Sequence, residues 1–95
     1  MTKYFIGGLQ IRCNEFDVKE AFSKSGTLKE VIIMRDKITG ISRGFGFIQF
    51  EDRVDLIPAG QVRVFGYHVL GRGVELKLAV PLEVTLVQSN TNIKN

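Results

Sequence analysis

The chain has 95 residues, of which 44% are hydrophobic and 24% charged, so it allows one modest hydrophobic core and excludes a second. Its formal net charge of +3 favours an anionic partner, although it lacks the dense basic run of a polybasic tail. Its single cysteine excludes an intrachain disulfide and a cysteine-based metal site, and no eighteen consecutive residues are apolar, so we expect a soluble intracellular domain without a membrane segment.

A strand and a helix are predicted near the start of the chain. KYFIGG, residues 3–8, is aromatic and β-branched and ends in two glycines, which is typical of a strand closed by a turn. In NEFDVKEAFSKSG, Asn14 is a candidate N-cap, Asp17 follows three residues later, and Gly26 is a stop signal. The spacing of the apolar residues between them predicts a helix over about residues 15–25.

A β-hairpin and a weak helical signal occupy the middle of the chain. The β-branched run TLKEVIIMRD and the stretch RGFGFIQF, residues 43–50, are separated by the polar loop DKITGIS, which predicts two paired strands. EDRVDLIPAGQ then has helical spacing through Val54 and Ile57, but Pro58 and Gly60 make a helix longer than one or two turns costly. We therefore expect a short or distorted second helix.

The last predicted elements are a turn and a strand. His68 to Leu70 is followed by the turn Gly71-Arg72-Gly73, and an alternating strand is expected from about Val74 to Val80. The predicted order βαββαβ is that of the ferredoxin-like α+β sandwich, a four-stranded antiparallel sheet with two helices on one face. Residues 1–81 are predicted to form this domain, and residues 82–95 a C-terminal extension that is partly flexible.

Alternation along RGFGFIQF separates its side chains into two sets. Arg43, Phe45, Phe47 and Gln49 share one face, while Ile48 and the final phenylalanine share the other with two glycines. Burial of the first set would leave the arginine without an obvious partner in the core. We therefore expect the first set on the open face, meaning the face of the sheet that no helix covers.

The same alternation in KYFIGG places Tyr4 and Ile6 in the core and sends Lys3 and Phe5 to the open face. Three aromatic rings and two cations then meet on one surface, which is unusual for a domain that binds nothing. A nucleic-acid base stacked on an aromatic ring contributes about 1–3 kcal/mol, and Lys and Arg neutralise phosphates. The pattern predicts binding of single-stranded nucleic acid.

Two motifs resemble those of a known family. RGFGFIQF resembles the octamer of the RNA-recognition motif, K/R-G-F/Y-G/A-F-V-x-F/Y, and YFIGGL resembles its hexamer. Within the family, KYFIGGL, GTLKEVIIMRD, SRGFGF and VELKLAVP are most similar to the heterogeneous nuclear ribonucleoprotein A/B and Musashi proteins, over about residues 3–81. The resemblance implies a module for purine-containing single-stranded RNA, with a role in RNA processing or mRNA regulation in the nucleus or cytoplasm.

The resemblance also implies roles for individual residues. Phe5, Phe45 and Phe47 would stack on bases, and Arg43 would hold a backbone phosphate. Ile32 and Met34 would contact bases or sugars at one edge of the surface that these rings form. The remaining predicted RNA-binding residues are Glu75, Lys77 and Ala79, which would line the other edge, and Lys3, Arg35 and Gln49.

Two other functions stay open. The same fold can bind a protein, for which Phe16 on the first helix is a candidate contact, although three exposed aromatic residues favour RNA. An enzyme similar to an acylphosphatase needs a phosphate-cradling loop beside an arginine and an asparagine; GGLQIRCNEF contains Arg12 and Asn14 but lacks the glycine spacing. No nucleophile and base can be paired, so we expect no enzymatic activity, metal or cofactor.

The expected partner is therefore single-stranded RNA, for which single-stranded DNA can substitute in vitro. We expect a monomer that binds no membrane. One module of this size contacts few bases, so a longer parent protein with further copies of the module is also expected.

Overall fold

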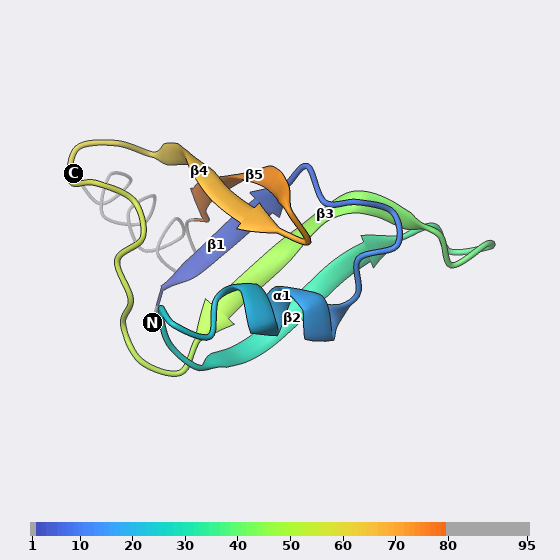
Figure 1. The fold of residues 1–95 in the computed structure, drawn as a ribbon, viewed down its shortest axis with the longest axis horizontal. Coiled ribbons are helices and arrows are strands. Elements are labelled where there is room, and N and C mark those ends of the chain that lie inside the picture. The colour runs from blue at the N-terminus through green and yellow to red at the C-terminus, as the bar shows by residue number, and fades with distance from the viewer. Residues whose placement is uncertain (1, 80–95) are drawn as a thin grey trace, which may run out of the picture.

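The computed structural model describes residues 2–79, which form an antiparallel sheet with a helix on one face (Figure 1). The elements are β1 (Lys3–Gly7), α1 (Glu15–Ala21), β2 (Leu28–Arg35), β3 (Ser42–Phe50), β4 (Arg63–Val69) and β5 (Arg72–Ala79). The strands lie in the order β2-β3-β1-β5-β4. An α+β architecture is thus confirmed, but this part of the chain has five strands and one helix where four strands and two helices were predicted.

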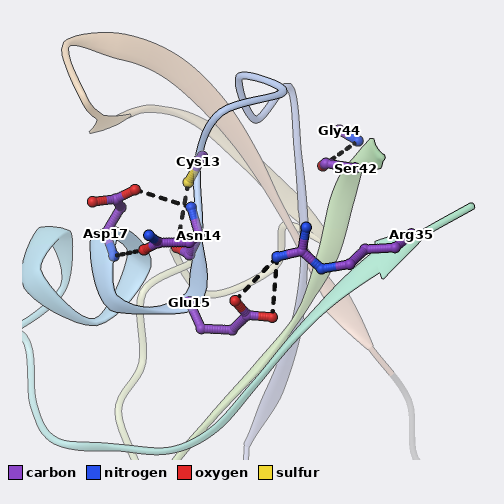
Figure 2. A network of polar contacts seen from close by, with 7 residues as sticks. All are labelled: Cys13, Asn14, Glu15, Asp17, Arg35, Ser42 and Gly44. Carbon is purple, nitrogen blue, oxygen red and sulfur yellow. Dashed lines mark hydrogen bonds and ion pairs between the residues drawn. The ribbon is translucent and has the colours of Figure 1, made fainter. Parts of the chain in front are cut away.

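A capping box begins α1. The side chain of Asn14 accepts a hydrogen bond from the backbone N–H of Asp17, and the Asp17 carboxylate accepts one from the backbone N–H of Asn14, both at 2.9 Å (Figure 2). The predicted start is confirmed, whereas the helix ends at Ala21, before residue 25. The backbone N–H groups of Ser25 and Gly26 both donate to the carbonyl of Phe22, so the chain leaves the helix through turns.

The core lies between α1 and the sheet, and it confirms the predicted faces of β1 and β3. Ile48 and Phe50 are completely buried, and Tyr4 and Ile6 are 1% exposed. From α1, Val18 and Phe22 pack into this layer. The helix contacts both β2 and β4, which are the two edge strands of the sheet.

Cys13 is buried at the start of α1. Burial raises the pKa of its thiol, and the nearby carboxylates of Asp17 and Glu15 act in the same direction. A buried thiol with a raised pKa holds little reactive thiolate at neutral pH. Its role is therefore one of packing.

Residues 51–62, where the second helix was expected, contain no helix. Two tyrosine hydroxyls hold this segment instead. The hydroxyl of Tyr4 donates to the carbonyl of Val54 and accepts from the N–H of Leu56 at 2.9 Å, and the hydroxyl of Tyr67 donates to the carbonyl of Leu56 at 3.2 Å. These long-range bonds satisfy backbone groups that a helix would otherwise pair internally. The expected second helix was therefore wrong.

The strand β4 was not predicted, and it forms the edge of the sheet beyond β5. Gly66 interrupts the alternation of this strand with a bulge between Phe65 and Tyr67, which concealed the strand in the sequence. The turn that follows consists of Leu70 and Gly71, with φ of 53° and 77°, and not of residues 71–73. Two successive positive φ angles are typical of the tight turns that join hairpin strands.

The predicted extension at residues 82–95, and the end of the last strand at Val80, lie outside the described residues. The division into a domain at 1–81 and an extension therefore stays a prediction. Across the described part of the chain, no helix has the length and apolarity that a membrane span requires.

Tyr4→Phe tests the anchoring of residues 51–62. We expect it to lower the free energy of unfolding by about 1–3 kcal/mol, because the N–H of Leu56 loses its buried acceptor. Urea unfolding measures the difference. Tyr67→Phe is the matched control and should lower the free energy of unfolding by less, because it removes one partly buried hydrogen bond.

The pH dependence gives this prediction a second readout. Burial raises the pKa of Tyr4 in the folded protein. The unfolded chain therefore ionises this tyrosine near its ordinary pKa of about 10, while the folded chain resists, and stability falls as the pH rises above that value. Tyr4→Phe should remove this part of the fall. If the wild type and Tyr4→Phe lose stability equally as the pH rises above about 10, the buried position of the hydroxyl is contradicted.

Gly46→Ala tests the close approach of β2 and β3. An added Cβ would overlap the carbonyl oxygen of Ile32 and lie 3.0 Å from the Cα of Ile33, so two backbones would have to separate. We expect a loss of about 1–3 kcal/mol in the free energy of unfolding. In the control Gly73→Ala the new Cβ meets only the Nε2 of His68, at 3.8 Å, so stability should change little. Equal losses in the two variants would refute the steric explanation.

Candidate nucleic-acid interface

Phe5, Phe45 and Phe47 lie together on the open face, as predicted. In the sheet register Phe5 is opposite Phe47, and Gly7 is opposite Phe45. The ring centroid of Phe5 is 5.7 Å from that of Phe45 in a stacked arrangement and 5.9 Å from that of Phe47 in an edge-to-face one. All three rings are half-buried by one another. We call these three residues the aromatic platform.

Gly7 makes room for the platform. A methyl group at this position would lie 2.8 Å from Cε2 and 3.1 Å from Cζ of Phe5, so the ring of Phe5 lies along its own strand over the glycine. A larger side chain at Gly7 would lift the ring out of contact with its neighbours. The first glycine of YFIGGL is thus a strand residue required by side-chain packing, whereas Gly8, with φ of 82°, ends the strand.

Each ring of the platform has one cation beside it. The guanidinium carbon of Arg43 is 5.1 Å from the centroid of Phe45, Nζ of Lys3 is 5.6 Å from that of Phe47, and Nζ of Lys77 is 5.5 Å from that of Phe5. At exposed sites such a cation–π contact contributes about 0.5–1 kcal/mol. A stacked base contributes about 1–3 kcal/mol. The cation–π contact is therefore weaker than the stacking of a base on the same ring.

Other predicted residues join the platform through the register of the sheet. Ile32 is opposite Phe47 and is 39% exposed, and Lys77 is opposite Phe5. Residues directly opposite in an antiparallel pair project on the same side of the sheet. By the same pairing Gln49, Ala79 and Glu75 lie on the open face.

The loop between β2 and β3 forms a hollow at one end of the open face. Three predicted residues, Met34, Arg35 and Arg43, line it together with Asp36, Lys37 and Ile38. The Asp36 carboxylate accepts hydrogen bonds from the backbone N–H groups of Thr39 and Ile38, both at 2.9 Å, and these bonds lower the pKa of Asp36. The loop therefore holds a negative charge in a hollow that is also lined by cations.

The guanidinium of Arg35 is paired with a carboxylate of the helix. Its Nη2 lies 3.1 Å from Oε1 and 3.4 Å from Oε2 of Glu15, the first residue of α1 (Figure 2). The register of β2 and β3 shifts between Ile33 and Arg35, so it is this ion pair that directs the guanidinium to α1. The predicted role of Arg35 in RNA binding stays a prediction.

Glu75, Lys77 and Ala79 lie on β5, next to the strand that carries Phe5, so they border the aromatic platform on the side away from β2. The strand β4 extends the sheet beyond them. Their predicted contacts with RNA stay a prediction.

Two residues of the open face were missed in the sequence. Arg63 is opposite Lys77, and Phe65 is opposite Glu75, so β4 adds both to this surface. Nη1 of Arg63 lies 3.1 Å from Oε2 of Glu75, and its guanidinium carbon is 5.9 Å from the ring centroid of Phe65. The β-branched and aromatic residues of VRVFGYHV were the signal for this strand, but the bulge at Gly66 broke the alternation.

The residues of the alternative functions lie elsewhere. Phe16 is 66% exposed on α1. The side chain of Asn14 is occupied by the helix cap, and Nε of Arg12 donates to the side chain of Gln10 at 3.0 Å. The two residues on which an acylphosphatase-like site would depend are thus already used in local structure.

Comparison with known proteins gives a consistent family. The sequence pattern of the family described as RNA recognition motif matches residues 5–62. The chain is 45% identical over 64 residues to "Deleted in azoospermia-like" of Gallus gallus, which covers 65% of this chain and 22% of that protein. It is 38% identical over 80 residues to "DAZ-associated protein 1" of Xenopus laevis, which covers 84% of this chain and 22% of that protein. The chain thus spans about a fifth of the length of these relatives.

Solved structures agree. The RRM domain of mouse Deleted in azoospermia-like superimposes with a TM-score of 0.64 at 32% identity, over 85% of this chain and 96% of that chain. The RNA-binding domain of Hrp1 in complex with RNA gives a TM-score of 0.61 at 34% identity, over 85% of this chain and 47% of that chain. The ferredoxin-like fold class is thereby confirmed, while the closer likeness to the heterogeneous nuclear ribonucleoprotein A/B and Musashi proteins stays a prediction.

Proposed function

The chain belongs to the RNA recognition motif family, and we propose that it binds single-stranded RNA on the open face of its sheet. Domains of this family bind RNA, and one of the similar structures is that of a domain in complex with RNA. The observation that carries the proposal for this chain is the aromatic platform, in which three contacting rings each have a cation within 5.6 Å.

Binding proceeds by steering followed by stacking. The cations of the open face attract the phosphate backbone over a distance of about one Debye length, roughly 8–10 Å at physiological ionic strength. Bases then stack on the platform, whose rings are held in place by contact with each other and with Gly7. Because the rings are already positioned, little side-chain entropy is lost when RNA binds.

The RNA is proposed to contain purines, adenine and guanine in particular. This rests on the likeness of KYFIGGL and SRGFGF to motifs of the heterogeneous nuclear ribonucleoprotein A/B and Musashi proteins. A role in RNA processing or mRNA regulation, in the nucleus or the cytoplasm, belongs to the same proposal. So does a longer parent protein with further copies of the module, in keeping with the small share of its relatives that this chain spans.

The platform is tested by Phe5→Ala and Phe47→Ala. Each should weaken the binding of a short purine-rich RNA by about 1–3 kcal/mol, or roughly 5- to 150-fold in Kd, because one stacking surface is lost. Fluorescence anisotropy with a labelled oligonucleotide measures Kd. Phe16→Ala is the matched control, since it removes an equally large ring from α1 and should leave Kd unchanged. Wild-type affinity in a Phe45→Ala, Phe47→Ala double variant would overturn the proposal, and RNA binding lost only on Phe16→Ala would point to the helix face.

Arg43→Ala tests the phosphate contact. A cation that neutralises one phosphate of a single strand adds about 0.7 to the slope of log K against log salt concentration, so the variant should have a shallower slope by that amount. Titrations at several salt concentrations measure the slope. Arg35→Ala is the comparison, because the guanidinium of Arg35 is paired with Glu15 and its loss should change the slope less than the loss of Arg43. A change in the slope with Arg35→Ala and none with Arg43→Ala would reverse the assignment of the two arginines.

A further inference from the structure

The strand β4 presents an exposed aromatic ring on the open face. Phe65 is 67% exposed, whereas the rings of the aromatic platform are half-buried. An outward-facing phenylalanine on a sheet edge loses hydrophobic stabilisation unless something covers it. Arg63 lies beside it, as a cation lies beside each ring of the platform.

The position of Phe65 follows from the register of four neighbouring strands. Phe45, Gly7, Glu75 and Phe65 are paired in succession, so they form one row across β3, β1, β5 and β4. Three strand spacings of about 4.8 Å place the backbone of Phe65 roughly 14 Å from that of Phe45. Phe65 is therefore too distant to stack on the platform, and it forms a separate position on the same surface.

The row leads from the platform directly to Glu75, because the ring of Phe5 lies over Gly7 and Gly7 adds no side chain of its own. Among the four paired residues, the only charge is the carboxylate of Glu75. Left alone, this carboxylate would repel a phosphate backbone, but Arg63 neutralises it through an ion pair of 3.1 Å. The ion pair uses Nη1, and the guanidinium has further N–H donors that can bind a phosphate.

We propose that Phe65 is a second base-stacking position, which takes a further base of the same single-stranded RNA once the strand extends from the platform across β5 to β4. Arg63 supports it by neutralising Glu75 and by contacting the phosphate that precedes or follows that base. This proposal rests on the proposed function. RNA is favoured over a protein partner because Phe65 is continuous with the platform in one row of the sheet and repeats its pairing of ring and cation.

The test compares two RNAs of one purine-rich sequence, a short one that covers only the platform and a longer one that reaches β4. Phe65→Ala should leave the Kd for the short RNA unchanged and weaken binding of the longer RNA by roughly 5- to 150-fold, the range for one lost stacking contact. Phe47→Ala should weaken both, and Phe16→Ala neither. Because the side chain of Phe65 is exposed, its removal should not unfold the domain, and urea unfolding checks this.

The outcomes separate this inference from the proposed function. If the wild-type protein binds neither RNA, the proposed function fails. If Phe47→Ala weakens both RNAs while Phe65→Ala binds the longer one like the wild type, the function stands and the second position is refuted, which would leave a protein as the partner of this ring. If Phe65→Ala weakens the short RNA equally, Phe65 belongs to the platform, and a separate position is likewise refuted. A shift of the Phe65 ring resonances by the longer RNA alone would support the proposal.

Discussion

The register of β3 is the constraint on which the open face depends. Ile48 and Phe50 are buried against the side chains of Tyr4 and Phe22, and the ring of Phe50 contacts both of the latter rings edge to face. Because side chains alternate, this burial forces Phe45 and Phe47 to the opposite side. A slip of one residue would exchange the two sets and bury Arg43. The core thus determines the binding surface through strand geometry alone.

Weak interactions explain how the platform rings can be partly shielded from water and still be accessible to a base. Mutual contact keeps the three platform rings half-buried, and the neighbouring cations occupy part of what remains exposed. Neither contact is strong enough to exclude a base, because cation–π contacts at exposed sites contribute less than base stacking. The surface is therefore stable in water without a ligand, and its groups do not need to move far when one binds.

The parts of the fold that the sequence predicted are those with local signals. The capping box of α1, the alternation of β3 and the glycines of YFIGGL all act within a few residues. Pro58 and Gly60 are a local signal against a long second helix. The anchoring of residues 54–56 has no such signal, since they are held by the hydroxyl of Tyr4, which is some fifty positions away in the chain. The direction of Arg35 likewise depends on Glu15, which only the folded chain brings close.

The bulge at Gly66 concealed β4 from the sequence pattern, and it has a second effect at the edge of the sheet. An edge strand offers unpaired N–H and C=O groups on which a strand of another molecule can form hydrogen bonds. A bulge kinks and twists such a strand, so a straight partner cannot follow it, and the charge of Arg63 further opposes close approach. The irregularity that obscures β4 in the sequence thus makes this border a poor template for aggregation.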